Sequence, residues 1–303
     1  MSPEETRGCD LWGVPFDGAS TLGWPGSRYA PARIREALGW MRMRAQDGRV
    51  YAVDTGALQA FPPDLIRDRG DVAVVPHDLM ATLAACSEAV ADSVRAGRVP
   101  IVLGGDDSLL YACLKGFHDG HQGTIGILHW DAHLDLLDES AAQGRYSQSS
   151  GMRRSLELER VSAAHTIQVG VRNFNFPASR RFIEEHGLEQ LPAAEFERLG
   201  AEAAAERIRR RLEGCDHVFW AFDIDVVDPS AAPGAGAHEP GGLTTRQVLD
   251  SVRLLAGSCG GMSIVEVNPL TDQRDMTSIL AANIAFAFAV YGLDGNPPLL
   301  NNP

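Results

Sequence analysis

The segment VPIVLGGDDSLLY, residues 99–111, carries the pattern from which the fold can be predicted. Its apolar run ends in two glycines and two aspartates, which is typical of a strand buried on both faces of a parallel sheet. Further apolar runs of this kind lie at residues 123–130, 165–171, 217–224 and 261–267. Stretches rich in Ala, Arg and Glu, which we expect to be helical, lie at residues 78–97, 177–187 and 193–214. Strands that alternate with helices predict an α/β protein, a three-layer α/β/α fold with a mostly parallel central sheet.

The chain as a whole has 303 residues, and neither a Ser/Gly-rich linker nor a repeat divides it, so we expect one domain over residues 1–303. Its formal net charge of -13 argues against nucleic acid or an anionic membrane as a partner. The acidic, polar start MSPEETRGCD is unlike a signal peptide, and no apolar run is long enough to span a membrane, which predicts a cytoplasmic protein. The five scattered cysteines form no C-x-x-C pair and are expected to be buried, reduced thiols.

Acidic residues at alternate positions follow two of the predicted strands. The segment ILHWDAHLDLLD places Asp131, His133 and Asp135 at such positions, and FWAFDIDVVDP does the same with Asp223 and Asp225. Alternate residues of an extended backbone point to the same side. Each segment therefore presents its polar side chains together at a strand end.

Two more strands end in carboxylates, at Asp106 and Asp107 and at Glu266. A single carboxylate at a strand end is readily explained by helix capping or by exposure to water. A cluster of six or seven without Lys or Arg between them would repel strongly unless cations neutralised it. Carboxylates with one imidazole suit a hard or borderline divalent ion, Mn²⁺ first, and two such ions with a shared water indicate a hydrolase.

The motifs GGDDS, DAHLD, FDIDVVDP and EVNP, in this order, resemble the four signatures of the ureohydrolase family, which includes arginase, agmatinase, guanidinobutyrase and formimidoylglutamase. Residues 13–38 and 232–244 are similar to agmatinase-type segments, so the resemblance covers nearly the whole chain. It implies an arginase-like fold, two Mn²⁺ ions per chain and a homo-oligomer.

The resemblance also implies roles for the matching residues. One manganese would be held by Asp107, Asp131, Asp135 and Asp223, and the second by Asp131, His133, Asp223 and Asp225, with Asp131 and Asp223 bridging. Asp135 would also orient the attacking hydroxide and pass its proton to the leaving amine. Glu266 would pair with the cationic amidine of the substrate, because a carboxylate matches that planar fork.

Asp107 departs from the family pattern, in which a histidine ligand usually follows GGD. Asp107 can coordinate the ion directly as a harder ligand, or its shorter side chain can leave that site weak. We expect coordination, because an unpaired carboxylate buried beside three others would be costly.

Ser150 is a second departure, because many arginases and agmatinases have a proton-shuttling histidine at this position of YSQSSGMRR. Formimidoylglutamases also tend to have Ser-Gly here. His238 and His129 are candidate replacements as proton carriers, and a structural or surface role is the simpler interpretation of each.

The residues expected to hold the far end of the substrate also depart from the family pattern. Leu137 and Asn175 are at the positions with which arginases hold the α-amino acid group, which disfavours L-arginine as the substrate. Arg153, Arg154 and Arg172 lie on segments expected to border the pocket, where one could bind a substrate carboxylate. Surface ion pairs are the alternative role for these arginines. Beside Glu266, the residues expected to bind substrate are Ser150, Asn175, Arg154 and His238.

The function predicted from these observations is a metal-dependent amidinohydrolase. It would cleave a linear C–N bond of a guanidino or formimidoyl compound and release urea or formamide with an amine. The substrate would be that of an agmatinase, a guanidino-acid hydrolase or a formimidoylglutamase. The alternative is a catalytically weakened paralogue that acts as a subunit or binding protein. The deacetylases that share the fold are disfavoured because their adjacent His-His pair is missing.

Overall fold

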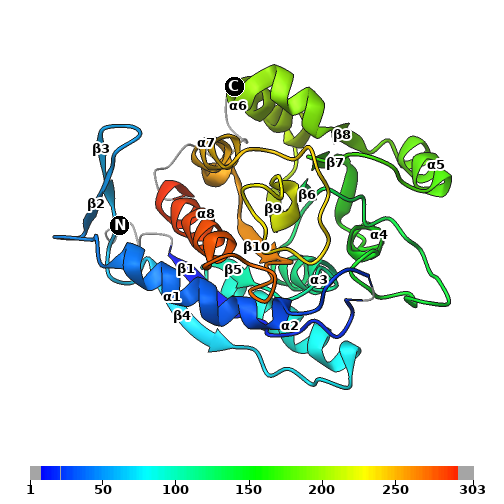
Figure 1. The fold of residues 1–303 in the computed structure, drawn as a ribbon, viewed down its shortest axis with the longest axis horizontal. Coiled ribbons are helices and arrows are strands. Elements are labelled where there is room, and N and C mark those ends of the chain that lie inside the picture. The colour runs from blue at the N-terminus through cyan, green and yellow to red at the C-terminus, as the bar shows by residue number, and fades with distance from the viewer. Residues whose placement is uncertain (1–7, 21, 293–303) are drawn as a thin grey trace.

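The computed structural model describes residues 8–20 and 22–292. Eight strands form one sheet in the order β4-β1-β5-β10-β9-β6-β7-β8, and each neighbouring pair is parallel (Figure 1). The strands are β1 (Cys9–Gly13), β4 (Ile66–Asp71), β5 (Val99–Leu103), β6 (Ile125–Trp130), β7 (Val161–Val169), β8 (Glu189–Leu191), β9 (His217–Asp223) and β10 (Gly261–Val265). The predicted parallel sheet is therefore confirmed.

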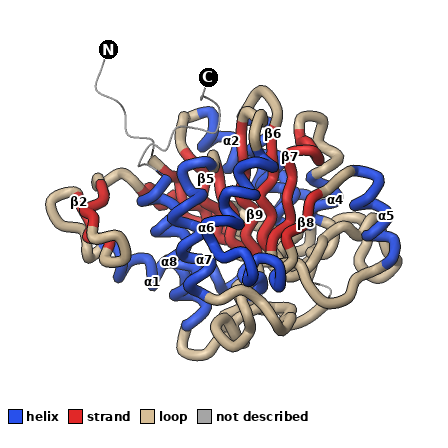
Figure 2. The backbone as a smooth tube through the Cα atoms, turned by 90° about the horizontal axis from the view of Figure 1, so that it is seen from above, coloured by secondary structure: helices blue, strands red, loops and turns tan. Residues whose placement is uncertain are grey.

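Helices cover both faces of the sheet (Figure 2). One face packs against α1 (Ala30–Arg42), α6 (Ala193–Leu212), α7 (Thr245–Leu255) and α8 (Met276–Gly292). The other packs against α2 (Leu79–Arg95), α3 (Leu109–Gly120), α4 (Gly151–Ser155) and α5 (Pro177–His186). Two apolar cores result, one on each side of the sheet, which is the predicted three-layer arrangement.

Local sequence explains where these elements begin and end. All residues of β5 and β6 are buried, as expected for central strands without a solvent face. Helix α2 starts at the N-cap Asp78, and α7 starts at a capping box formed by Thr244 and Gln247. No helix within the described residues is long and apolar enough to cross a membrane.

A separate antiparallel hairpin of β2 (Arg49–Ala52) and β3 (Ala57–Ala60) projects from one end of the molecule (Figure 1). The sequence patterns considered above did not predict it. Its strands are short and partly exposed. All five cysteines are buried, as expected, and none is in a disulfide among the described residues.

Strand order determines the position of the site, because β5, β10, β9 and β6 are consecutive at the centre of the sheet. These four strands are the ones that end in the acidic motifs. Strand β10, the last of the described strands, lies between β5 and β9 and joins the two halves of the sheet. The carboxyl ends of parallel strands meet at one edge, which is where α/β proteins bind ligands.

Candidate metal centre

The turn after β5 brings two aspartates to the sheet edge in different roles. Asp106 turns toward the polypeptide, where its Oδ2 accepts a hydrogen bond from Ala19 N (2.8 Å) and its Oδ1 one from Ser108 N (3.1 Å). Burial raises the pKa of Asp106 to about 6. The Asp107 carboxylate faces the site, and its buried Oδ2 makes no hydrogen bond in the described part of the chain. Asp106 thus shapes the turn, while Asp107 is left for a ligand.

The chain approaches itself closely at this turn. A Cβ on Gly105 would lie 1.5 Å from Phe16 O, so only glycine fits there. Phe16 O accepts a hydrogen bond from Asp106 N (2.9 Å), which ties the turn to the loop after β1.

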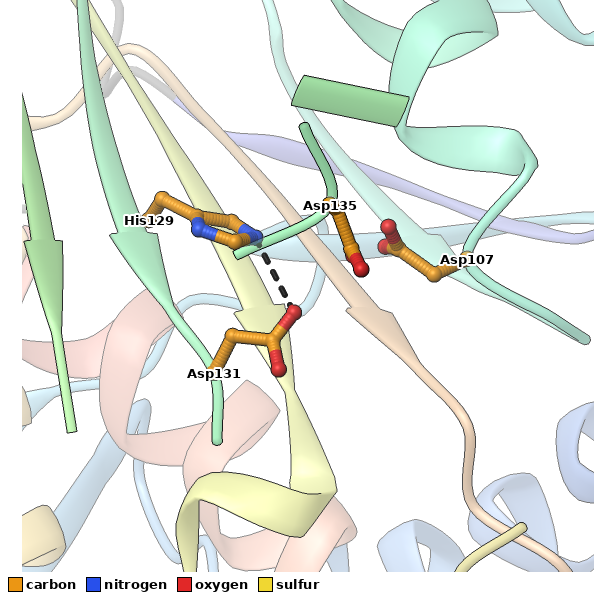
Figure 3. A group of neighbouring side chains, drawn as sticks. All are labelled: Asp107, His129, Asp131 and Asp135. Carbon is orange, nitrogen blue, oxygen red and sulfur yellow. Dashed lines mark ion pairs between the residues drawn. The ribbon is translucent and has the colours of Figure 1, made fainter. Parts of the chain in front are cut away.

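The segment after β6 carries the densest group of site residues. His133 Nδ1 lies 3.3 Å from Asp131 Oδ1 and 3.0 Å from Asp225 Oδ2. Asp135 and Asp107 point toward one another (Figure 3). Asp135 has φ 50°, in the left-handed region that is unfavourable for non-glycine residues and is often found at functional sites.

Strands β9 and β10 contribute the remaining carboxylates. Asp225 N donates to Asp223 Oδ1 (2.8 Å), and Asp225 Oδ1 accepts from Ala132 N (3.0 Å). Glu266, with φ 60°, accepts a hydrogen bond at Oε1 from Asp107 N (2.8 Å). Its Oε2 lies beside Gly236, where a Cβ would come within 2.6 Å. The missing side chain of Gly236 therefore leaves Oε2 accessible.

Two groups of side chains in this cluster have the arrangement of metal ligands. Asp107, His129, Asp131 and Asp135 form one group, and Asp131, His133 and Asp225 form the other. Within each group the ligand atoms lie within 4.8 Å of one another. Asp131 belongs to both groups, as expected for a carboxylate between two ions. Asp223 lies beside them in the same pocket but belongs to neither group.

Burial and mutual repulsion dominate the electrostatics of the cluster. Burial, together with nearby carboxylates, raises the pKa values of Asp107, Asp135, Asp223 and Glu266 well above their usual range. Carboxylates held together in this way favour a bound cation.

Two imidazoles have the opposite effect on Asp131. Burial alone would raise its pKa, but the neighbouring His129 and His133 imidazoles hold it below the usual range. Burial alone would lower the pKa of His133, but Asp225 and Asp131 raise it to about 12. Asp107 Oδ2 and Asp131 Oδ2 are buried without a hydrogen-bond partner among the described residues. These unpartnered carboxylate oxygens and the oxygen-rich donor set fit a divalent cation.

His129, which sequence analysis considered as a proton carrier or as a structural histidine, lies beside Asp131 in the structure. It is buried, and its Nε2 lies 3.2 Å from Asp131 Oδ2 (Figure 3). Gln168 Nε2 donates to Leu134 O (2.8 Å) and lies 3.1 Å from His129 Nδ1. Because an amide NH₂ only donates, Nδ1 accepts and the ring hydrogen is on Nε2, facing Asp131. The signal in the sequence is that His129 precedes Asp131 by two residues on the same strand face.

A pocket of about 430 Å³ opens above the cluster. Its acidic floor includes Asp107, Asp135, Asp223, Asp225 and Glu266. The walls are formed by Leu22, Leu134, Leu136, Leu137, Gln148, Ser149, Phe174, Asn175, Phe176, Ser179 and Ala237, with His133 beside the floor. The expected residue Asn175 is thus at the pocket, and its Oδ1 accepts from Phe176 N (2.8 Å) and Ser179 Oγ (3.0 Å).

Three residues expected to bind substrate are not among those that line this pocket. Ser150 Oγ donates to the carbonyls of Arg145 and Ser147. Arg154 is buried and pairs with Asp138 (2.6 Å). His238 Nε2 contacts Pro233 O (2.7 Å). In each case another group of the protein holds the side chain, a contact that motif spacing does not indicate.

The parallel sheet, with an acidic cluster at its carboxyl edge that could hold a cation, defines the class of protein. The chain is an α/β protein with a candidate metal centre. The Arginase family model matches residues 7–290, so the chain belongs to the arginase family. It is 33% identical over 288 residues to proclavaminate amidinohydrolase of Streptomyces clavuligerus, covering 92% of this chain and 87% of that protein. It is 32% identical over 280 residues to guanidinopropionase of Pseudomonas aeruginosa, with coverage of 91% and 84%.

The fold is shared with solved structures of this family. The crystal structure of formimidoylglutamase from Bacillus subtilis matches with a TM-score of 0.83 at 28% identity. That match covers 96% of this chain and 88% of the other. Amidinohydrolases of this family are enzymes, and the present chain contains a buried Asp/His cluster able to bind a metal.

Proposed function

We propose that the protein hydrolyses a linear C–N bond of a guanidino or formimidoyl compound, releasing urea or formamide and an amine. The observation that supports this most directly is the pair of ligand groups that share Asp131, because their members Asp107, His133, Asp135 and Asp225 line one pocket together with Glu266. The names of the relatives reported above describe hydrolases of amidino, guanidino or formimidoyl compounds, which agrees with this geometry.

The proposed centre contains two manganese ions. Asp107, Asp131, Asp135 and Asp223 would hold one, and Asp131, His133, Asp223 and Asp225 the other. When bound, such ions would supply Lewis-acid chemistry that lowers the pKa of a bound water toward neutral pH. Asp107 takes the place of a histidine ligand, and its unpartnered Oδ2 supports this role.

Two carboxylates carry the remaining chemistry. Glu266 binds the planar cationic amidine through Oε2, which Gly236 leaves accessible, and places the amidine carbon above the cluster. Asp135 accepts the proton of the attacking water and returns it to the leaving amine nitrogen. His129 Nε2 lies 3.2 Å from Asp131 Oδ2, and this contact would keep the proposed shared carboxylate oriented. A cytoplasmic location remains a prediction from the sequence pattern, and assembly into homo-oligomers remains a prediction from the family resemblance.

A substrate panel with the Mn²⁺-loaded protein tests this proposal. Agmatine, guanidinobutyrate, guanidinopropionate, arginine and formimidoylglutamate are assayed for urea, formamide and ammonia, and metal analysis is expected to give two ions per chain. Glu266→Gln should keep both ions and lose at least about a hundredfold in kcat/KM, because a charged pair with the amidine becomes a neutral one.

The exposed Glu202→Gln on α6 is the matched control and should behave as wild type. Failure of the loaded wild type to retain any metal would contradict the enzymatic proposal and favour a non-catalytic paralogue. Loss of metal in Glu266→Gln would instead place Glu266 among the ligands.

A further inference from the structure

The wall of the pocket differs in character from its floor. Above the carboxylates, the wall presents leucines, among them Leu136 and Leu137, and two phenylalanines, and its uncharged polar members are Gln148, Ser149, Asn175 and Ser179. Phe174 is 99% exposed and Phe176 is 68% exposed, and both border the pocket in the segment between β7 and α5. Exposed large apolar side chains that rim a cavity mark a surface for an apolar ligand.

The arginines that sequence analysis placed near the pocket are engaged elsewhere. Arg153 stacks on the ring of Phe182, with Cζ 3.9 Å from its centroid. Arg154 pairs with Asp138, as described above. Arg172 Nη2 donates to the carbonyls of Asp225 (2.7 Å) and Glu239 (2.6 Å). Arg154 Nε and Nη1 are buried without a hydrogen-bond partner among the described residues, and none of the three arginines is among the residues that line the pocket.

These contacts decide which substrate tail the pocket accepts. A carboxylate at the far end of the substrate would lie against Leu and Phe side chains above a negatively charged floor, and would lose hydration without a cation in return. An ammonium would also lose hydration against the apolar wall, although the floor would attract it. An alkyl or aryl tail has no such cost and gains from burial against the wall.

One polar group on the wall adds a specific requirement. Gln148 Nε2 donates to Leu22 O (2.9 Å), which fixes the amide. Its Oε1 is buried and makes no hydrogen bond to any described residue. An N–H or O–H group on the substrate tail would satisfy that acceptor.

We propose that the substrate is a guanidine whose far end is uncharged and largely apolar, with an N–H or O–H donor for Gln148, as in an amide of a guanidino acid. This inference rests on the proposed hydrolysis, but it concerns the tail of the substrate and not the bond that is cleaved. The proposed substrate differs from that of relatives named for guanidino acids, such as guanidinopropionase.

Four compounds with the same four-carbon chain test the inference: 4-guanidinobutanamide, N-butylguanidine, 4-guanidinobutyrate and agmatine. We measure kcat/KM for urea release by the Mn²⁺-loaded protein, and competitive binding of each compound by calorimetry. The amide should be the best substrate, N-butylguanidine the second, and guanidinobutyrate at least about tenfold worse than the amide, equivalent to about 1.4 kcal/mol. A preference for guanidinobutyrate or agmatine would overturn the inference.

The calorimetric measurement separates the two proposals. If no compound is hydrolysed but the neutral compounds still bind more tightly, the proposed hydrolysis fails and the inference about the tail stands. If the compounds are hydrolysed without regard to tail charge, the inference fails and the hydrolysis stands. Equal binding without hydrolysis contradicts both.

Two variants test the wall directly. Phe174→Arg adds a cation at the rim, at a position exposed enough to leave folding unaffected, and should improve kcat/KM for guanidinobutyrate relative to N-butylguanidine by about tenfold. Leu58→Arg on β3, 62% exposed and outside the pocket, is the matched control and should leave that ratio unchanged. Gln148→Met should reduce the preference for the amide over N-butylguanidine. An unchanged amide preference would remove Gln148 from the proposal.

Discussion

His129 connects the metal centre to a buried hydrogen-bond chain. Gln190 donates to Gln168, Gln168 to His129, and His129 faces the shared ligand Asp131. Groups that orient metal ligands in this way typically change metal affinity by about 10–100-fold when removed. We expect His129→Phe to weaken Mn²⁺ binding by about tenfold and to lower activity at subsaturating metal, measured by calorimetric titration and by pulsed EPR of the bound ion.

The competing role, direct coordination by His129, makes a different prediction. A ligand nitrogen would give an additional imidazole coupling in the wild-type EPR spectrum that His129→Phe lacks. A donor to Asp131 gives the same nitrogen couplings in both proteins. Unchanged affinity in His129→Phe would show that the contact with Asp131 does not orient the ligand.

At the scale of elements, the turn after β5 depends on the absence of a side chain at Gly105. Gly105→Ala would force a Cβ to within 1.5 Å of Phe16 O, a backbone atom that cannot move aside alone. We expect a loss of stability of about 2–4 kcal/mol and weaker metal binding, because Asp106 and Asp107 move with the turn. Urea unfolding with the metal chelated measures the first effect.

Gly39 in α1 provides the matched control, because nothing lies within 4 Å of its Cβ position. Gly39→Ala should stabilise the protein by about 0.5–1 kcal/mol through its higher helix propensity. If Gly105→Ala unfolds at the wild-type urea concentration, the close approach to Phe16 is not a constraint.

For the whole molecule, the acidic cluster links stability to pH and metal. The pKa values of Asp107, Asp135, Asp223 and Glu266 are raised by folding, so their contribution to stability is fully present below about pH 4 and is lost as the pH rises through the folded-state values. The raised pKa of His133 acts in the same direction above about pH 6.5. Asp131, with a lowered pKa, opposes them only at acidic pH.

The metal-free protein should therefore have a lower Tm at pH 8 than at pH 5. Mn²⁺ should raise Tm more at pH 8, since protons no longer compete for the ligands. Free Mn²⁺ at about 100 times its Kd should add about 2.7 kcal/mol. Thermal melts with chelator and with Mn²⁺ measure both effects. A metal-free Tm that does not change over this range would mean that the carboxylates do not interact as described.

The sequence was sufficient to predict features that depend on local periodicity. Buried apolar runs predicted the strands of the sheet, and the acidic residues at the strand ends predicted a shared edge. The structure confirms these strands and places at this edge Asp107, Asp131, His133, Asp225 and Glu266. A single domain over residues 1–303 and the role of each site residue remain predictions.

Contacts between distant segments could not be predicted in the same way. Side-chain packing, which the spacing of residues in the sequence does not encode, pairs Arg154 with Asp138 and places Gln168 beside His129. The hairpin of β2 and β3 has little apolar alternation to signal it. The local sequence pattern thus predicts which residues lie at the site. Whether a given residue is a metal ligand, a hydrogen-bond donor or neither depends on the three-dimensional structure.

The position of β10 between β5 and β9 has a consequence for how the protein matures. During synthesis the ligands after β5 and β6 leave the ribosome long before β10, which closes the gap between the two halves of the sheet. A nascent chain lacking β10 holds its carboxylates without the strand that fixes their spacing. Sheets built from such distant pairings fold slowly. Capture of the metal is therefore expected to be among the last events of folding, after β10 has taken its place in the sheet.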